Sequence, residues 1–242
     1  MQVIPINKQP IEKRNNEARS LEVHSIFLTI QGEGPFTGYP AVFIRLAGCN
    51  LQCPSCDTDY TNGRKGMSVE AIVSEVKSVH SECNARPIVV ITGGEPFRQN
   101  IEQLVELLLR QDFTVQVETN GTLAPLNVQA PVWFNRKFHI VCSPKAGKVH
   151  NWIANRADCF KYVLSADSVD PEDGLPILAL NHTASPRVAR PFFSTKNKPI
   201  YLQPMDAKDQ AKNDANVCAV LQSCIKHGYI FQLQTHKYIG VE

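Results

Sequence analysis

The stretch Cys49-Asn50-Leu51-Gln52-Cys53-Pro54-Ser55-Cys56 places three thiols within eight residues. Thiolates are the usual protein ligands of iron–sulfur clusters, and a four-iron cluster normally takes four of them. Three cysteines spaced in this way can hold one cubane and leave one iron open to a small molecule. The alternative is a structural zinc site with His24 or His236 as the fourth ligand. Zinc sites usually consist of two ligand pairs, and the chain has no second Cys-x-x-Cys pair, so the spacing favours a cluster.

The overall composition is that of an ordinary globular protein. The chain has 242 residues, of which 43% are hydrophobic and 20% are charged, which is enough for one domain with a sizeable core. Its net charge of +2 is too small to indicate binding to nucleic acid or to an anionic membrane. A small anionic substrate remains compatible with this composition.

The remaining cysteines indicate a reducing compartment. They are scattered along the chain, and we expect most of them to be reduced core thiols: Cys83, Cys142, Cys159, Cys218 and Cys224. No signal peptide or transmembrane run is evident, so the sequence predicts a cytoplasmic protein. Residues 1–21 mix basic and acidic side chains, and they predict a polar, poorly ordered N-terminal extension.

Short apolar runs alternate with helical patterns from residue 22 onward. We expect strands at 23–30, 41–46, 87–92, 114–118, 139–142, 159–164, 199–202 and 229–233. Helices are expected at 68–80, near 101–108 and at 207–226. This alternation predicts an α/β fold with a parallel sheet. A complete eight-fold barrel needs about 250 residues. We therefore predict a partial, open βα barrel in a single domain, 22–242, with an irregular insertion at about 167–198. The sequence does not decide the role of its basic part, 181–198.

Polar clusters follow most of the expected strands, where ligands bind in parallel sheets. They are Gly93-Gly94-Glu95-Pro96, Glu118-Thr119-Asn120-Gly121, Ser143-Pro144-Lys145, Gln203-Pro204-Met205-Asp206 and Gln234-Thr235-His236-Lys237. In the first of these, paired glycines allow close backbone approach to a ligand, and the Glu95 carboxylate could hold an amine. Together with the cysteine run, the clusters predict the rim of an active site.

The cysteine run and Gly93-Gly94-Glu95-Pro96 resemble the motifs of radical S-adenosylmethionine (SAM) enzymes, in which the open iron chelates SAM. The flanking elements indicate one family within this superfamily. Gln31-Gly32-Glu33-Gly34, Cys56-Asp57-Thr58 and Gln234-Thr235-His236-Lys237 resemble the 7-carboxy-7-deazaguanine synthase family of queuosine and 7-deazapurine biosynthesis. This resemblance runs from about residue 22 to the C-terminus, and it independently implies the partial barrel.

The resemblance implies a role for each matching position. Cys49, Cys53 and Cys56 would hold a [4Fe-4S] cluster. Residues implied to bind SAM are Ser55, Cys56, Asp57, Gly94, Ser143, Pro144, Lys145, Gln203, Pro204, Met205 and Asp206. Residues implied to contact a pterin substrate are Ile30, Gln31, Gly32, Glu33, Arg45, Thr92, His236 and the C-terminal Glu242. Thr58 would be the protein ligand of Mg²⁺, which often keeps waters and takes further ligands from substrate. Glu33, Lys145 and His236 could move protons or merely position other groups.

The implied reaction converts 6-carboxy-5,6,7,8-tetrahydropterin to 7-carboxy-7-deazaguanine with loss of ammonia. Flavodoxin or ferredoxin is the implied reductant, and the family implies a homodimer. Two other interpretations stay open at this stage. One is a glycyl-radical-enzyme activase that uses the same cluster, and the other is a non-catalytic binding module stabilised by zinc.

Overall fold

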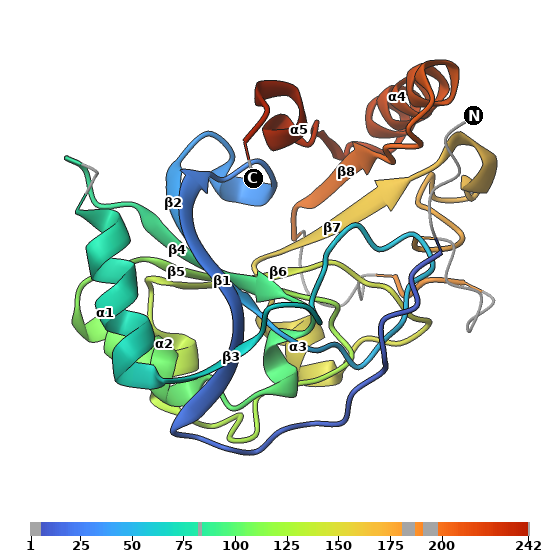
Figure 1. Cartoon of the computed structure of the whole chain (residues 1–242). Helices are drawn as coiled ribbons and strands as arrows, with labels where there is room; N and C mark the ends of the chain where they lie inside the picture. Colours follow the sequence, from blue (N-terminus) through green and yellow to red (C-terminus); the bar gives the residue numbers. More distant parts are fainter. Residues whose placement is uncertain (1–5, 82–83, 181–186, 191–197, 242) are drawn as a thin grey trace.

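A computed structural model describes residues 6–81, 84–180, 187–190 and 198–241. Within these residues one open sheet of nine strands has the order β3-β1-β2-β4-β5-β6-β7-β8-β9. The sheet does not close on itself, so the predicted partial βα barrel is confirmed (Figure 1).

The strands and helices follow the predicted alternation closely. The strands are β1 (Ser20–Ile30), β2 (Pro40–Leu46), β3 (Lys65–Ser68), β4 (Ile88–Gly93), β5 (Val115–Thr119), β6 (Phe138–Cys142), β7 (Cys159–Leu164), β8 (Ile200–Pro204) and β9 (Ile230–Phe231). The helices are α1 (Val69–His80), α2 (Glu102–Arg110), α3 (Asn151–Arg156), α4 (Gln210–His227) and α5 (Thr235–Ile239). Sequence patterns missed β3, α3 and α5, which have four to six residues each.

The sheet is parallel from β2 to β9 but begins with antiparallel strands. β1 pairs antiparallel with both β2 and β3. Only residues 31–39 connect β1 to β2, and a parallel crossover normally needs a dozen or more residues. The predicted parallel sheet therefore extends from β2 to β9, and the edge formed by β1 and β3 is antiparallel.

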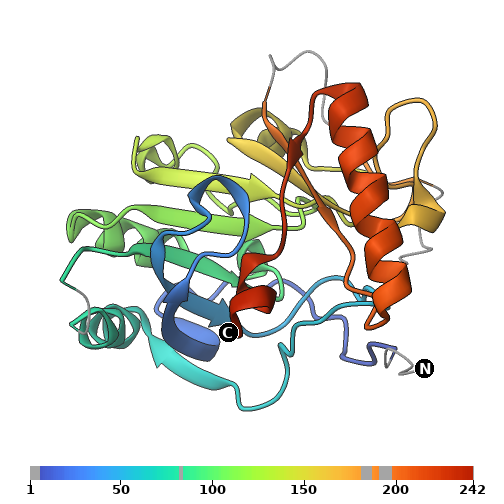
Figure 2. The same cartoon turned by 90° about the horizontal axis from the view of Figure 1, so that it is seen from above.

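Helices cover the outer face of the sheet and leave its concave face free (Figures 1 and 2). Helix α1 begins because Ser68 caps it, accepting a hydrogen bond from the Ala71 amide. Ile72, Val73 and Val76 recur at helical spacing and are buried against the sheet. The same core continues to α2, α3 and α4 as one cluster. This outer core fixes the strands whose carboxyl ends carry the site.

Two predictions about the chain outside this core are corrected. Residues 6–19 are not loose: residues 7–12 hydrogen-bond to the loop that bears the three cysteines, and residues 13–19 hydrogen-bond to the strand ends and turns beyond it. The C-terminal motif does not simply end a strand, because Thr235–Ile239 forms α5 and begins directly after Gln234. The carbonyl of Gly32 accepts a hydrogen bond from the Thr235 amide and ties this short helix to the β1–β2 connection.

Two arginines of the insertion are paired with acidic side chains of the same insertion. Arg187 and Arg190 pair with Asp170 and Asp173, at 2.6–3.3 Å. Residues 181–186 and 191–197 of the basic stretch lie outside the described residues. Among the scattered cysteines, Cys142, Cys159 and Cys224 are buried free thiols as predicted, Cys218 is exposed, and Cys83 is not among the described residues. No helix in the described part of the chain is long and apolar enough to cross a membrane.

Candidate active site

A cavity of about 590 Å³ opens where the carboxyl ends of the parallel strands meet. It is lined by nearly every residue that the sequence suggested for a cofactor or substrate: Ile30, Gln31, Gly32, Glu33, Arg45, Cys49, Cys53, Ser55, Cys56, Asp57, Thr58, Thr92, Gly94, Ser143, Lys145, Gln203, Met205, Asp206 and His236. Pro144 and Pro204 are not among the lining residues, and Glu242 lies outside the described residues. The sequence motifs thus converge on one cavity.

The three cysteines of the run face this cavity together. Burial raises the pKa of Cys49 to about 12 and that of Cys53 to about 11, and it also raises the pKa of Cys56. The neighbouring thiols raise the pKa of Cys49 further, and all three cysteines line the same cavity. Among the described residues, no three His, Cys, Asp or Glu side chains are close enough to share one metal ion. A four-iron cluster has no such requirement, because each thiolate binds a different iron. Three thiols that line one cavity therefore fit a four-iron cluster with one iron left open.

A buried charge network forms the floor of the cavity. Lys161, from the inner face of β7, is only 5% exposed and pairs with Glu33 and with Glu118. Its Nζ lies 3.7 Å from Glu118 Oε2. Burial alone would raise the pKa of Glu33, but the Lys161 ammonium overcomes this and lowers it. Conversely, burial would lower the pKa of Lys161, and the two carboxylates raise it. Both members of the Glu33–Lys161 pair are therefore charged at neutral pH.

Amide and hydroxyl groups complete the network around each carboxylate. Glu33 Oε1 accepts from Gln234 Nε2 at 2.6 Å and from Gln203 Nε2 at 3.2 Å. Glu118 accepts from the side chains of Gln31 and Gln116, both at 3.1 Å, and from Thr92 at 3.3 Å. Gln203 Oε1 is buried, and it has no hydrogen-bond partner within the described part of the chain. An orphaned acceptor beside a cavity is available to a hydrogen-bond donor on a ligand.

Sequence reasoning missed Lys161, and it placed Glu118 at the rim of the site without giving its side chain a role. The available signal was a charged residue inside the apolar strand Cys-Phe-Lys-Tyr-Val-Leu, because a buried lysine requires a partner. Strand alternation would have placed Lys161 and Val163 on the same face, and both line the cavity.

Lys145 and Arg45 contribute two further cations to the wall. Lys145 Nζ donates to Ser143 Oγ at 2.7 Å, and burial, assisted by the positive charge of Lys161, lowers the pKa of Lys145. The Arg45 guanidinium lies 5.2 Å from the centre of the Phe27 ring, in a cation–π contact. These cations suit a ligand that carries a carboxylate.

In the Gly93-Gly94-Glu95 turn, the Glu95 carboxylate does not face a ligand as the sequence suggested. Glu95 is fully buried, and its carboxylate accepts from the amides of Phe97 and Asn120 and from the Thr119 hydroxyl. It does not line the cavity, so the prediction that its side chain holds an amine is wrong. A Cβ on Gly94 would lie 1.9 Å from the carbonyl oxygen of Gly48, so close backbone packing requires a glycine there.

The C-terminal motif reaches the cavity through α5. Lys237 Nζ lies 3.1 Å from Asp57 Oδ2 and 2.9 Å from Gln234 Oε1, so it joins this end of the chain to the cysteine loop. Burial lowers the pKa of His236, and the nearby Glu33 opposes the shift. A Cβ on Gly32 would lie 2.3 Å from His236 Nδ1, which explains why a glycine precedes Glu33.

Comparisons with known proteins agree with this geometry. Residues 43–166 match the model of the radical SAM superfamily. A protein of Rhodospirillum rubrum named 7-carboxy-7-deazaguanine synthase is 37% identical over 231 residues, which cover 93% of this chain and 94% of the relative. One of the same name from Rickettsia prowazekii is 38% identical over 236 residues, covering 94% of this chain and 92% of the relative. The crystal structure of QueE from Escherichia coli has a TM-score of 0.63 and 25% identity, and the match covers 90% of this chain and 95% of that one.

Proposed function

This chain belongs to the 7-carboxy-7-deazaguanine synthases of the radical SAM superfamily, and we propose that it converts 6-carboxy-5,6,7,8-tetrahydropterin to 7-carboxy-7-deazaguanine with loss of ammonia. The observation that carries the assignment is one cavity in which three thiols face a floor of paired charges and an amide oxygen without a hydrogen-bond partner in the described part of the chain. The relatives favour this activity over a glycyl-radical activase or a zinc-stabilised module.

The thiol side of the cavity is the proposed cofactor side. Cys49, Cys53 and Cys56 would hold a [4Fe-4S] cluster, and SAM would lie against 55–57, Gly94, 143–145 and 203–206. When bound, the cluster and SAM supply a 5′-deoxyadenosyl radical, the species that removes a hydrogen atom from substrate in this superfamily. The protein's own part is to orient the ligands, exclude water and set the charges around them.

The floor of the cavity is the proposed pterin side. The ring edge of a pterin carries several N–H donors, and Glu33, Glu118 and Gln203 Oε1 are acceptors at the cavity. Arg45 would pair with the substrate carboxylate because its planar fork matches two oxygens. Further contacts would come from Ile30, Gln31, Gly32, Thr92, His236 and the terminal Glu242. Lys161 would keep the negative charge of the floor balanced.

The remaining assignments concern ions and partners. We propose Thr58 as the protein ligand of a Mg²⁺ ion, because it lines the cavity beside the thiols and Mg²⁺ accepts few protein ligands. An enzyme of this kind requires a low-potential electron donor, for which flavodoxin or ferredoxin is proposed. We further propose that it works as a homodimer in the reducing cytoplasm.

Mass spectrometry of the product tests the proposed function. Anaerobically purified, iron-loaded protein is incubated with SAM, Mg²⁺, a reductant and 6-carboxy-5,6,7,8-tetrahydropterin. We expect 7-carboxy-7-deazaguanine together with 5′-deoxyadenosine and methionine. Formation of 5′-deoxyadenosine with an unchanged pterin would contradict the assigned substrate.

A further inference from the structure

The N-terminal segment, residues 6–17, lies along the cysteine loop, residues 49–61. Its backbone makes a parallel bridge between Ile11 and Cys49, and the Glu12 amide donates to the Cys49 carbonyl at 2.8 Å. The Asn7 amide donates to the Pro54 carbonyl at 2.9 Å. Residues 50–64, all of them described, form no helix or strand of their own. The segment therefore satisfies backbone groups that the loop cannot satisfy alone.

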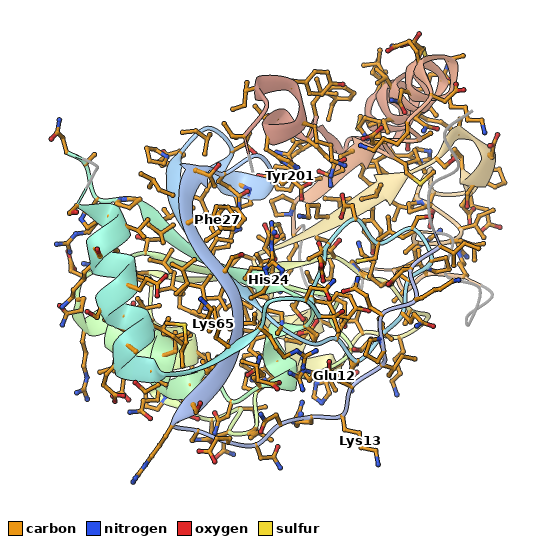
Figure 3. All side chains as sticks on the ribbon, in the orientation of Figure 1. Glu12, Lys13, His24, Phe27, Lys65 and Tyr201 are labelled. Carbon is orange, nitrogen blue, oxygen red and sulfur yellow. The ribbon has the colours of Figure 1, made fainter. Side chains whose placement is uncertain are left out.

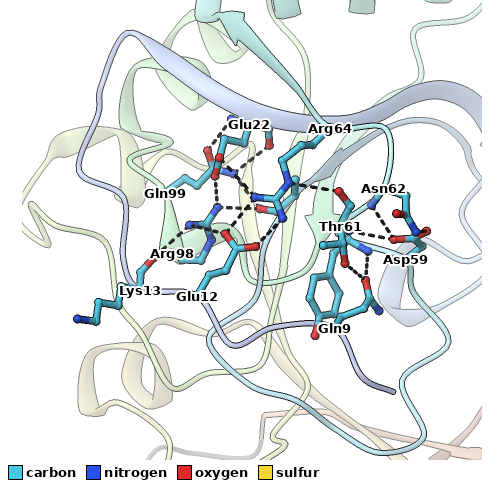
Figure 4. Close-up of polar contacts among 12 residues, drawn as sticks. Gln9, Glu12, Lys13, Glu22, Asp59, Thr61, Asn62, Arg64, Arg98 and Gln99 are labelled. Atoms are coloured by element: carbon cyan, nitrogen blue, oxygen red, sulfur yellow. Dashed lines mark hydrogen bonds and ion pairs between the residues drawn. The ribbon is translucent and has the colours of Figure 1, made fainter. Parts of the chain in front are cut away.

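Gln9 makes four hydrogen bonds between the N-terminal segment and the cysteine loop. Its Nε2 donates to the Thr58 carbonyl at 2.8 Å, and its Oε1 accepts from the Tyr60 amide at 2.7 Å and from the Thr61 hydroxyl. Its own carbonyl accepts from Gln52 Nε2 at 2.5 Å. Gln9 thus holds the loop on both sides of Cys53 and Cys56. Figure 4 shows its side chain directed at Thr61, with Asp59 and Asn62 beyond.

Behind Gln9, the segment is anchored by ion pairs that include one buried arginine, Arg98. Glu12 pairs with Arg64 at 2.5 Å and with Arg98 at 3.4 Å, and Arg98 is only 3% exposed (Figure 4). Arg98 also donates to the Lys13 carbonyl at 3.1 Å, and its own carbonyl accepts from the Asn15 amide. The segment cannot slide along the loop without breaking these pairs.

We propose that the N-terminal segment is a clamp on the cysteine loop, and that Gln9 is the positioning residue that sets the loop for its cluster. This inference rests on the proposed function, because it takes the three thiols as cluster ligands. A loop without regular structure holds ligands in place only as well as its surrounding contacts do. Asn7 supports the clamp, since its Nδ2 donates to the Cys53 carbonyl at 3.2 Å.

The test compares Gln9→Ala with Lys13→Ala. Lys13 lies in the same segment, but its exposed side chain points away from the protein (Figure 3), and only its backbone carbonyl contacts Arg98. In iron-free protein, the Tyr60 amide should exchange its hydrogen about tenfold faster in Gln9→Ala, because its acceptor is gone. In cluster-loaded protein under nitrogen, iron loss to the chelator ferrozine should also become about tenfold faster, since the same loop opening exposes the iron.

A spectroscopic measurement separates positioning from general stability. The electron paramagnetic resonance spectrum of the reduced cluster with SAM should change in Gln9→Ala and should match wild type in Lys13→Ala. Asn7→Ala should shift exchange and iron loss in the same direction, and it keeps the test open if Gln9→Ala does not fold. Equal exchange rates, iron loss and spectra in Gln9→Ala and Lys13→Ala would overturn the clamp. Because the exchange measurement needs no iron, it tests the clamp even if the proposed activity fails.

Discussion

Replacing Lys161 by Met should reveal how strongly the floor of the cavity depends on one buried cation. Lys161 lies between Glu33 and Glu118, and both it and Glu33 are largely buried. Removing one partner of a buried ion pair leaves an uncompensated charge and typically costs about 3–5 kcal/mol. Methionine fills a similar volume, so little of this loss should come from a cavity. We expect the free energy of unfolding of Lys161→Met to fall by this amount at pH 7.

The loss should depend on pH with a defined sign. In the wild type the pKa of Glu33 is lowered, so ionised Glu33 adds stability above its unfolded pKa, and this is lost only as pH falls through the lowered value. In the variant, burial dominates and the pKa of Glu33 should rise above its ordinary value, about 4.3. Ionising Glu33 then opposes folding as pH rises. The difference between wild type and variant should therefore grow from pH 4 to pH 7.

Urea unfolding of the iron-free, reduced protein between pH 4 and pH 8 measures these quantities. Lys77→Met is the matched control, since Lys77 is exposed on α1, and it should change stability by less than about 0.5 kcal/mol. The double variant Glu33→Gln/Lys161→Met should recover part of the loss, because no buried Glu33 charge remains. A loss below about 1 kcal/mol in Lys161→Met, or one that does not vary with pH, would refute the charge-balance argument.

Three further predictions concern the cofactor side. Cys53→Ala should lose the iron cluster and SAM cleavage, whereas Cys218→Ala, at an exposed thiol, should keep its iron; equal iron content in the two would contradict the ligand assignment. Thr58→Ala should retain cluster and SAM binding but lose most of the stimulation of turnover by Mg²⁺, and an unchanged Mg²⁺ titration would remove Thr58 from the metal site. Gly94→Ala would place a Cβ 1.9 Å from the Gly48 carbonyl, so it should lower stability by about 2 kcal/mol or more in urea unfolding; a smaller loss would show that this backbone contact can relax.

The sequence could predict the parallel part of the sheet because most of its strands are short apolar runs. The strand at 159–164 was predicted with the same limits that the structure has. It could not predict β3, whose Lys-Gly-Met-Ser has no apolar alternation and becomes a strand only by pairing with β1. Likewise, α5 is too short to show periodicity, and it is held by Gly32 from the other end of the chain.

The site was predictable where chemistry and position coincide in a local motif. The three cysteines and the clusters at the strand ends met that condition. Lys161 did not, because a lone lysine in a strand gives no indication of its partners, and Glu33 lies 128 residues away in sequence. The N-terminal segment was missed for the same reason: its polar residues are typical of a loose extension, and their partners lie in the cysteine loop.

Glu95 shows how a motif can lie beside the cavity and still mislead about the role of one side chain. Burial raises the pKa of Glu95 to about 7, and hydrogen bonds from Thr119, Asn120 and the Phe97 amide oppose this shift. The carboxylate therefore organises the protein: it holds Asn120, whose Nδ2 in turn donates to Asn50 Oδ1 at 3.0 Å, in the cysteine loop. An acceptor for the amine of a ligand must then come from backbone carbonyls or from side chains that do line the cavity. The Gly93-Gly94-Glu95 turn and the cysteine loop are therefore linked through hydrogen bonds between Glu95 and Asn120 and between Asn120 and Asn50. The spacing of the two motifs in the sequence does not reveal this link.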